Sequence, residues 1–460
     1  MLQTHENTSA AGAVSATRSL AIPHDDRLPG MTALLDAGLV RTYLGLQRSD
    51  AAEGILDCRV VHANYRPGKK CVASYVVTRP NGVGGAVQQL FGYGICFEAT
   101  TFAKVRGKEI AEDWVMPAIG RPVITLPDHH VLLFAYPNDR KLGSLRILET
   151  EHGLRQFLSS YLNDCRLAEK QLSVSLMWPQ YRPEKRAVLR CRMASGLTTY
   201  LKVYSDECAT RMYATLARLL QWQESQADFA IPRPLASTRD GHILMLSSVN
   251  GDSLRSLVGS GGERVALERA AEALASLHRY YDLQLPHRTA ADHLKEAQRR
   301  VQSLAQLTPE LSAQVEDIGF MLQCKLPHDD QCSVGFVHGD LGLRNVLVDP
   351  RKIGFIDFDG AHNGPVAADL GRITAALRNL FLDRDATEER KLEDAFLQAY
   401  CRAARRSFTP EVIAWWTALG LIRFAAKPIR QLEANGVNKA KELLDEALRT
   451  LKSPERTGAA

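Results

Sequence analysis

The chain has 460 residues, of which 45% are hydrophobic and 24% are charged, and its formal net charge is +5. This composition is typical of a globular protein, and the length suggests about three units of roughly 150 residues each. Acidic residues are interleaved with the basic ones, which excludes the strong basic stripe of a nucleic-acid-binding domain. We therefore expect no nucleic-acid partner.

The nine cysteines are scattered and form no C-x-x-C pair, so neither a zinc site nor a disulfide framework is indicated. Residues 1–22 are rich in Ser, Ala and Thr and lack the apolar run of a signal peptide, and we expect them to be disordered. No stretch reaches the roughly 18 consecutive apolar residues of a membrane helix. These features favour a cytoplasmic protein with no membrane partner, and they leave the oligomeric state open.

The first half of the sequence contains two similar segments. Pro23–Leu28 aligns with Pro137–Leu142, and Tyr65–Lys70 aligns with Tyr181–Arg186. The offset stays between 112 and 116 residues at all of the matching positions. Chance similarity is the alternative, but the preserved order and spacing favour a duplication.

Each copy predicts the same order of elements. A helix (Gly30–Leu44 or Leu142–Leu162) precedes two strands that meet at a Tyr-Arg-Pro turn, where proline fixes φ. A third strand follows (Tyr93–Phe97 or Tyr200–Tyr204), and a helix and two short strands come after it.

From about Ser253 the pattern becomes mostly helical. The one strong β-type interruption is Phe336–Phe358, and roughly the last hundred residues predict helices, including Phe396–Ala404, Val412–Ala426 and Lys439–Leu451. A β-rich part is therefore followed by a helical part that holds one hairpin, which indicates the α+β class.

The hairpin segment carries three side chains with acceptor oxygens. Asp340 and Asn345 are five residues apart, and Asp357 follows twelve residues later, beyond a turn that would fold it back beside them. Mg²⁺ prefers oxygen ligands and uses only a few side chains together with phosphates and water. Phosphoryl transfer needs such a metal, a cradle for the phosphates and a carboxylate for the proton of the alcohol. The plainer alternative is a polar turn between buried strands.

This arrangement resembles the aminoglycoside phosphotransferase and choline kinase superfamily, which is related to the protein kinases. The family pattern of H-G-D-x-x-x-x-N, a downstream I-D and a further D-L is present as His338-Gly339-Asp340…Asn345, Ile356-Asp357 and Asp369-Leu370. The resemblance covers roughly residues 170 to 430. It implies a protein-kinase-like bilobal fold, with a β-rich N-lobe and a helical C-lobe.

The resemblance also implies roles for particular residues. Asp340 would be the catalytic base, Asn345 and Asp357 would hold Mg²⁺, and Asp369 would brace the catalytic loop. Arg344 would approach the transferred phosphate, although a surface salt bridge is an equal alternative.

On the nucleotide side, the resemblance makes Lys202 the lysine that binds the α- and β-phosphates of ATP. Met245 and Ser247 lie in an apolar run that resembles the family's hinge, where backbone groups would meet adenine. His278 and His338 would have structural roles.

The sequence departs from the family pattern at the expected phosphate cover. The strand pair around Tyr181 has no glycine-rich loop, so this cover would come from the backbone of residues 178–186 and from basic side chains. Candidates for these side chains are Arg182, Lys185 and Arg186.

Two further departures concern Lys202. No glutamate stands at the expected spacing after it, because Glu207 is too near and Glu224 is too far. In the first copy, Ile95 occupies its position. We therefore expect four parts: a disordered N-terminus (1–22), a degenerate, N-lobe-like, non-catalytic cap (23–136), a nucleotide-binding N-lobe (137–250) and a helical catalytic C-lobe (251–455).

The leading functional hypothesis is ATP- and Mg²⁺-dependent transfer of the γ-phosphate to a hydroxyl of a small molecule. The alternatives are an aminoglycoside-type antibiotic kinase, a protein kinase and a nucleotide-binding regulatory pseudokinase. Gly339 replaces the arginine that is usual in protein kinases, and no A-P-E segment follows Asp357.

Residues of the helical part bear on the identity of the acceptor. Basic residues are mixed with the carboxylates after Asp359, which favours a sugar-like or other neutral or anionic hydroxylated metabolite over a polycationic drug. These basic residues are Arg372, Arg378, Arg402, Arg423, Lys427 and Arg430. Trp415 and Trp416 would either stack on a sugar ring or pack in the core of the helical part.

Overall fold

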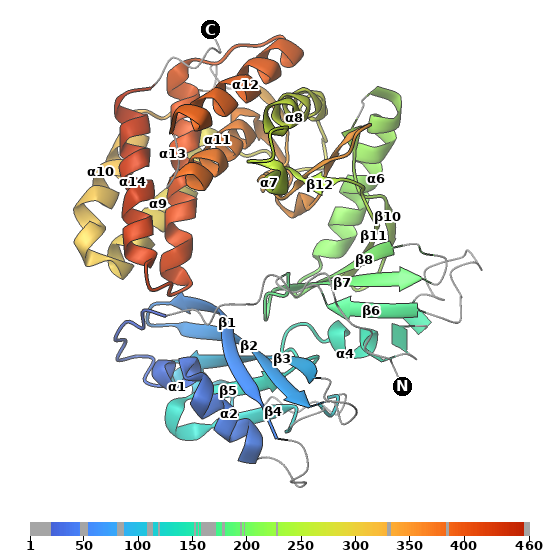
Figure 1. Cartoon of the computed structure of the whole chain (residues 1–460), viewed down its shortest axis with the longest axis vertical. Coiled ribbons are helices and arrows are strands. Elements are labelled where there is room, and N and C mark those ends of the chain that lie inside the picture. Colours follow the sequence, from blue (N-terminus) through green and yellow to red (C-terminus); the bar gives the residue numbers. More distant parts are fainter. Residues whose placement is uncertain are drawn as a thin grey trace. The chain divides into compact units, whose positions relative to one another are not determined.

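The structure is a computed structural model, and the residues that it describes are 20–46, 54–80, 87–107, 114–117, 120–150, 153–154, 156–157, 172–176, 180–193, 196, 198–226, 229–328, 333–382 and 386–454. The chain divides into two compact units (Figure 1). Unit 1 consists of Met1–Thr210, Leu235–Met245 and Arg430–Gly436, and unit 2 of Arg211–Pro234, Leu246–Ile429 and Val437–Ala460. The expected disordered segment, residues 1–22, lies outside the described residues except for its last three.

The first sheet of unit 1 has five antiparallel strands in the order β1-β2-β3-β5-β4. These are β1 (Asp57–Arg66), β2 (Lys70–Pro80), β3 (Val87–Phe97), β4 (Val123–Leu126) and β5 (Val131–Ala135), and the helices of this copy are α1 (Met31–Leu35), α2 (Ala37–Leu46) and α3 (Ala99–Val105). The single helix expected over Gly30–Leu44 is divided at Asp36. This residue is extended (φ −84°, ψ 99°), and its Oδ1 accepts the N–H of Leu39 at 3.0 Å, so it ends α1 and caps α2.

The second sheet repeats this strand order. It runs β6-β7-β8-β11-β10, which matches β1-β2-β3-β5-β4 strand for strand (Figure 1). Its strands are β6 (Leu172–Leu176), β7 (Arg186–Met193), β8 (Thr198–Tyr204), β10 (Pro234–Ser237) and β11 (Ile243–Ser247), accompanied by α4 (Ser144–Leu148) and α6 (Cys208–Gln226). The helix expected over Leu142–Leu162 begins as α4, and most of its second half lies outside the described residues.

A pair of hydrogen bonds recurs in the two copies. Asp25 accepts the Tyr65 hydroxyl at 2.7 Å and the Gly68 N–H at 2.8 Å through Oδ2. In the second copy, Asp139 accepts the Tyr181 hydroxyl at 2.8 Å and the Glu184 N–H at 2.9 Å through the same atom. Gly68 and Glu184 are both left-handed, with φ of 59° and 60°. The sequence repeat is thus also a structural repeat.

Strand register places Ile95 and Lys202 at equivalent positions. Val72 on β2 pairs with Ile95 on β3, and Val188 on β7 pairs with Lys202 on β8. Ile95 is fully buried in a hydrophobic cluster that takes residues from both sheets. Members from the first copy include Val72, Tyr93, Ile95 and Phe134, and members from the second include Tyr181, Leu189, Leu201 and Met245. The two copies therefore share one core.

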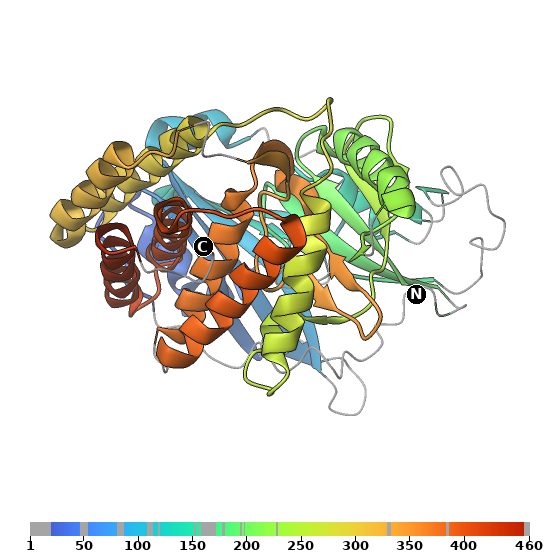
Figure 2. The same cartoon turned by 90° about the horizontal axis from the view of Figure 1, so that it is seen from above.

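Unit 2 contains two small sheets and most of the helices (Figure 2). One sheet has the order β12-β14-β15-β9, and in the other β13 pairs with β16. The strands are β9 (Phe229–Ala230), β12 (Asp252–Ser253), β13 (Val334–Val337), β14 (Val346–Val348), β15 (Ile353–Phe355) and β16 (His362–Pro365). The helices are α7 (Leu254–Leu257), α8 (Glu263–Leu277), α9 (Ala290–Leu307), α10 (Ser312–Cys324), α11 (Ala367–Phe381), α12 (Ala386–Ala404), α13 (Pro410–Arg430) and α14 (Gly436–Lys452). The predicted hairpin and C-terminal helices are confirmed.

Helix α13 is long and apolar enough to cross a membrane by composition, yet 78% of its most apolar window is buried inside the protein. It packs closely on α11 through two glycines. A Cβ atom on Gly371 would lie 2.4 Å from the backbone of Trp416, and one on Gly420 would lie 2.5 Å from the Cβ of Ala375. This close approach lets polar side chains from the two helices meet, and Thr374 and Thr417 share a hydrogen bond of 2.7 Å between their hydroxyls.

Candidate active site

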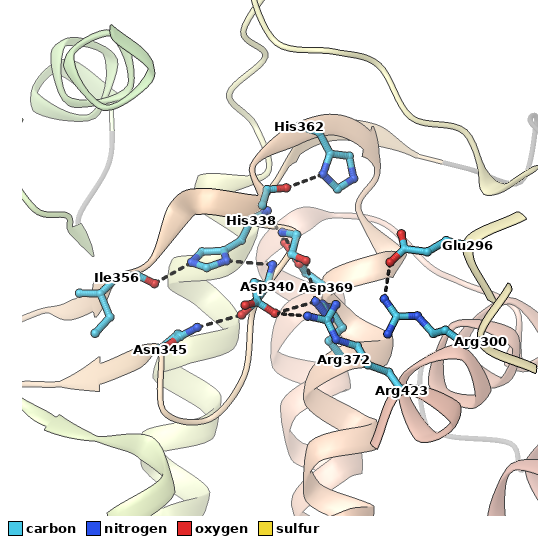
Figure 3. Close-up of polar contacts among 12 residues, drawn as sticks. Glu296, Arg300, His338, Asp340, Asn345, Ile356, His362, Asp369, Arg372 and Arg423 are labelled. Atoms are coloured by element: carbon cyan, nitrogen blue, oxygen red, sulfur yellow. Dashed lines mark hydrogen bonds and ion pairs between the residues drawn. The ribbon is translucent and has the colours of Figure 1, made fainter. Parts of the chain in front are cut away.

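The loop that follows β13 is anchored by a buried carboxylate. Asp369, in the first turn of α11, accepts the backbone N–H of His338 at 2.6 Å and that of Gly339 at 3.1 Å (Figure 3). His278, at the end of α8, adds a contact of 3.3 Å through Nε2. Burial raises the pKa of Asp369, but the hydrogen bonds from the His278 side chain and from the backbone of His338 outweigh it and hold the pKa at about 2. Asp369 thus braces the loop in its ionised form.

Only glycine fits at position 339. Gly339 has φ of +76°, and a Cβ atom there would lie 2.0 Å from the carbonyl oxygen of Gly360. L-residues with a side chain seldom adopt this conformation, and the contact would force the two loops apart. The replacement of the usual protein-kinase arginine by glycine therefore follows from local packing.

His338 is neutral and holds the loop from beneath. Its Nε2 lies 2.9 Å from the carbonyl oxygen of Ile356, so Nε2 carries the proton and donates. Its Nδ1 then accepts the backbone N–H of Asp340 at 3.4 Å. Burial lowers the pKa of His338, despite opposing charge from Asp369, which agrees with this tautomer. The prediction of a structural role for His338 is consistent with these contacts.

Asp340 is held by two arginines. Its Oδ1 accepts Nη2 of Arg372 on α11 at 2.9 Å and Nη2 of Arg423 on α13 at 2.7 Å (Figure 3). Arg372 also donates to the carbonyl oxygen of Gly339 at 2.7 Å. The Asp340 side chain is 36% exposed, so it can meet a solute. Both arginines bind the same oxygen, which leaves Oδ2 for a substrate hydroxyl.

The two predicted metal ligands flank a pair of adjacent strands, with Asn345 directly before β14 and Asp357 two residues after the end of β15. Ile356 N–H donates to the carbonyl oxygen of Asn345 at 3.0 Å, which places Asp357 one residue beyond the end of this pairing. Asn345 Nδ2 donates to the carbonyl oxygen of Asp340 at 2.9 Å, so the amide oxygen is the atom turned outward for a ligand. Asp357 itself is left-handed (φ 68°, ψ 59°), a strained conformation of the kind found at functional sites.

One amide oxygen and one carboxylate suit a hard cation. In the part of the chain that the structure describes, no group of three or more His, Cys, Asp and Glu residues could enclose a metal. Mg²⁺ needs no such cage, because it keeps several waters and shares its coordination with phosphates. Asn345 and Asp357 therefore fit Mg²⁺ better than they fit zinc, which prefers four nitrogen or sulfur ligands.

Further arginines lie near the catalytic loop. Arg300 and Arg288 flank Glu296 on α9, and the Arg288–Glu296 contact is 2.8 Å. Burial acts to raise the pKa of Glu296, but these two guanidinium groups lower it to about 2. Desolvation and the positive charges of Arg372 and Arg300 lower the pKa of Arg423 to about 10, although Asp340 opposes this. The surroundings of Asp340 are thus rich in positive charge.

Of the predicted nucleotide residues, Lys202 and Met245 lie in unit 1, and Ser247 and Arg344 lie in unit 2. Lys202 is 8% exposed in the middle of β8, and Met245 is fully buried in the shared core. Ser247 uses its N–H and its hydroxyl to bind the backbone of Arg233, at 3.0 and 2.9 Å. Glu224, the distant candidate for pairing with Lys202, instead contacts Arg233 at 3.1 Å. The buried side chain of Met245 therefore contributes to the packing of the shared core.

A cluster of positive charge occupies the Tyr-Arg-Pro turns of unit 1. Burial and, after it, the neighbouring charges of Arg66, Arg430 and Arg182 together lower the pKa of Lys185 to about 8. Residues 178 and 179 of the expected phosphate cover lie outside the described residues. Bound phosphate would relieve the repulsion at Lys185.

The sequence left two alternatives open, one for the tryptophans of α13 and one for Arg344. Trp415 is fully buried and donates through Nε1 to the carbonyl oxygen of Leu322 at 2.9 Å, and Trp416 is 2% exposed. Both belong to the helical core, so stacking on a sugar ring is wrong. Arg344 is exposed, and its approach to the transferred phosphate stays a prediction.

In the sequence, Arg372 and Arg423 stand out only as part of a basic segment, and their contact with Asp340 is not predicted. One signal for Arg372 was available. It stands three residues after Asp369, so both side chains leave the same face of α11 toward the loop. Arg423 is 83 residues from Asp340 and carries no such signal.

About half of the chain matches the model of a known protein family. Residues 192–416 match the model of the phosphotransferase enzyme family. No curated protein sequence matches the chain.

Solved structures of several phosphotransferases are similar to the chain. Choline kinase from Cryptosporidium parvum is 11% identical, with 66% of this chain and 96% of that chain covered and a TM-score of 0.48. Macrolide 2'-phosphotransferase from Brachybacterium faecium is 17% identical, with coverages of 66% and 98% and a TM-score of 0.41. An aminoglycoside phosphotransferase from Streptomyces rimosus is 21% identical, with coverages of 57% and 97% and a TM-score of 0.41. Similarity at this level does not identify a substrate.

Proposed function

Because the chain belongs to the phosphotransferase enzyme family, as the match over residues 192–416 shows, we propose that it uses ATP and Mg²⁺ to phosphorylate a hydroxyl of a small molecule. A sugar-like or other hydroxylated metabolite is the favoured acceptor. One observation carries the proposal. The candidate base, Asp340, stands on a loop braced by Asp369 and is tied through its own carbonyl oxygen to Asn345.

Asp340 has the properties that the proton transfer requires. Its Oδ1 is fixed by two guanidinium groups, so the carboxylate plane is held and Oδ2 can accept a hydrogen bond from the acceptor hydroxyl. As the hydroxyl oxygen attacks the γ-phosphorus of ATP, the bond from that phosphorus to the β–γ bridging oxygen breaks and ADP leaves, while the hydroxyl proton passes to Oδ2. The buried Asp369 keeps the peptide groups of His338 and Gly339 in place during this step. Positioning of this kind is the main contribution of the protein in phosphoryl transfer.

Asn345 and Asp357 would hold the metal, and Lys202 would bind the nucleotide phosphates. When bound, Mg²⁺ would offset the negative charge that accumulates on the phosphates. Lys185 and its neighbours Arg182 and Arg186 would cover the phosphates, which is supported by the lowered pKa of Lys185. Backbone groups near Met245 and Ser247 would meet adenine, and the exposed Arg344 would approach the transferred phosphate.

The parts of the chain would divide this work. We propose that residues 23–136 are a non-catalytic cap, residues 137–250 the nucleotide-binding lobe and residues 251–455 the catalytic lobe. Ile95 at the position of Lys202 supports a cap that binds no nucleotide. A reducing cytoplasm suits the seven described cysteines, which are all free thiols.

A screen by ADP release tests the proposed function. Purified protein is mixed with ATP, with and without Mg²⁺, and with sugars, amino alcohols, nucleosides or aminoglycosides. We expect Mg²⁺-dependent ADP release that rises with at least one hydroxylated acceptor and is lost in Asp340→Asn. Mass spectrometry then locates the phosphate on the product. ADP release that does not require Mg²⁺, or that Asp340→Asn retains, would contradict the proposal.

A further inference from the structure

We propose that the acceptor carries an oxyanion, a carboxylate or a phosphate ester, close to the hydroxyl that is phosphorylated, and that Arg423 binds this group. The inference rests on the proposed function, because it concerns the acceptor side of the same site. It narrows the acceptor class from hydroxylated metabolites in general to hydroxy acids and sugar phosphates.

The first argument is the number of guanidinium groups at Asp340. One carboxylate oxygen receives both Arg372 and Arg423, at 2.9 and 2.7 Å. A lone carboxylate offsets the charge of one arginine, so the second stays uncompensated at this position. An anion supplied by the acceptor would complete the pairing.

The two arginines differ in what they can offer a ligand. The Arg372 side chain is 15% exposed and is committed to the loop through Gly339 and Asp340. The Arg423 side chain is 42% exposed, and its one hydrogen bond to the described residues goes to Asp340. A guanidinium has five N–H donors in a planar fork that matches carboxylate and phosphate oxygens. Arg423 thus has donors to spare beside the catalytic carboxylate.

The wider electrostatics point the same way. Desolvation and the charges of Arg372 and Arg300 lower the pKa of Arg423 to about 10, so its positive charge is held against repulsion. Glu296, a second carboxylate whose charge acts on Arg423, is already paired with Arg288 and Arg300. Figure 3 shows Arg300 and Arg423 approaching the loop from the same side as Arg372. A polycationic acceptor would meet repulsion at this place.

Two other roles for Arg423 would give different kinetic results. If Arg423 stabilises the transferred phosphoryl group, its loss lowers kcat for every acceptor by a similar factor. If it only forms a salt bridge that positions Asp340, its loss changes all acceptors alike and leaves their ranking unchanged. An acceptor subsite instead raises the KM of anionic acceptors alone.

The test uses acceptors that share a carbon frame and differ in charge. One set is glycerol, glycerate and glycerol phosphate, and another is glucose, gluconate and glucose 6-phosphate, with choline as the cationic member. We expect kcat/KM for an anionic member to exceed that of its neutral partner at least tenfold. The carboxylate and phosphate arms identify which oxyanion is preferred. Equal or better use of the neutral or cationic acceptors would overturn the inference and leave the proposed kinase function standing.

Variants then assign the preference to Arg423. Arg423→Gln should lower the anionic-to-neutral ratio at least tenfold through the acceptor KM, and Arg423→Lys should restore part of it. Arg402→Gln, at an exposed position on α12, removes the same charge outside the site and should keep the ratio of the parent. An anionic-to-neutral ratio in Arg423→Gln equal to that of the parent, whether or not kcat falls for all acceptors alike, would overturn the subsite.

A binding measurement covers the case in which no acceptor of the panel is turned over. In the presence of Mg²⁺ and a non-hydrolysable ATP analogue, glycerol phosphate or glycerate should raise the melting temperature of the parent and of Arg402→Gln, but not of Arg423→Gln. Glycerol should raise none of them. Equal shifts in the parent and in Arg423→Gln, or no shift in either, would contradict the inference. Absence of Mg²⁺-dependent ATP turnover with an intact anion response would instead contradict the kinase function.

Discussion

His338 donates its backbone N–H to Oδ2 of Asp369 at 2.6 Å, and both residues are fully buried. The contact joins the start of the catalytic loop to the first turn of α11, so the loop cannot move without breaking a charge-assisted hydrogen bond. The helix N-terminus also favours the negative charge of Asp369. The position of Asp340, two residues after His338, therefore depends on the ionisation of a residue that touches no substrate.

The ionisation of Asp369 should make the free energy of unfolding depend on pH in the acid range. Its pKa in the folded protein, about 2, lies below the ordinary value of 3.8. Its stabilising contribution is complete above about pH 4 and is lost as the pH falls from about 4 toward about 2. When the free energy of unfolding is measured in urea at pH 5 and at pH 2.5, it should fall by roughly 2 kcal/mol more in the parent than in Asp369→Asn. Asp252→Asn, on an exposed strand, should retain the parental slope. Equal slopes in the parent and Asp369→Asn would rule out this role.

Asp340→Asn should reduce turnover by about 10²–10⁴, the usual contribution of a positioned general base. The asparagine keeps the shape of the side chain and can still accept from Arg372 and Arg423, so folding and ATP binding should change little. Turnover is measured by ADP release, ATP affinity by calorimetry and folding by thermal melting. Turnover within a factor of about three of the parent would remove Asp340 from the role of base.

Asp357→Ala should abolish Mg²⁺-dependent nucleotide binding, because the metal loses its carboxylate ligand. Alanine at φ of 68° also adds backbone strain, which could lower affinity by itself. Asp357→Gly separates the two effects, since glycine adopts positive φ freely but offers no ligand. We expect both variants to lose the Mg²⁺ dependence in titration calorimetry. If Asp357→Gly binds Mg²⁺ and nucleotide as the parent does, the metal assignment is wrong.

The parts of this site that sequence predicts are those set by short spacing. Asp340 and Asn345 sit on one loop, and a four-residue turn between β14 and β15 fixes the return of Asp357. The contact of Arg423 with Asp340 depends instead on how closely α13 packs on α11, which no local pattern reports. Likewise, two adjacent tryptophans on an apolar helix predict either a core or a binding surface, and only burial decides between them.

The split of the first predicted helix has a similar explanation. Hydrophobic spacing continues through Asp36, so periodicity alone predicts one helix over Gly30–Leu44. The Asp36 side chain competes with the helix by accepting the N–H of Leu39, and it starts a second helix. The repeat was easier to predict, because Asp25 and Asp139 recur with their tyrosines in the sequence itself.

Glu184→Gln should destabilise unit 1. The Glu184 side chain is 3% exposed, and its carboxylate accepts Lys70 Nζ at 2.5 Å and Arg140 Nε at 2.6 Å. In Glu184→Gln, the partly buried cations Lys70 and Arg140 lose the negative charge that they share. This loss should lower the free energy of unfolding by roughly 3 kcal/mol. Glu224→Gln removes an exposed partner of Arg233 and should cost under about 1 kcal/mol. Chemical denaturation measures both, and equal effects would contradict the structural importance of the buried cluster.

Deletion of residues 1–136 should give poorly soluble or unstable protein rather than a slower enzyme. Tyr93 stacks on Phe134 with ring centroids 4.8 Å apart and meets Tyr181 of the second copy edge-on at 6.4 Å. The Tyr93 hydroxyl also accepts the N–H of Arg140 at 3.0 Å. Without the first copy, this face of the second sheet would present a large apolar surface to water, which promotes association. The shortened chain is compared with the parent by soluble yield, size-exclusion chromatography and binding of a hydrophobic dye.

Ile95→Ala serves as a milder test, because a cavity in the shared core should cost roughly 2–5 kcal/mol in stability without removing any candidate catalytic residue. A shortened chain that stays soluble, monodisperse and fully active would show that the first copy is dispensable for the fold of the second.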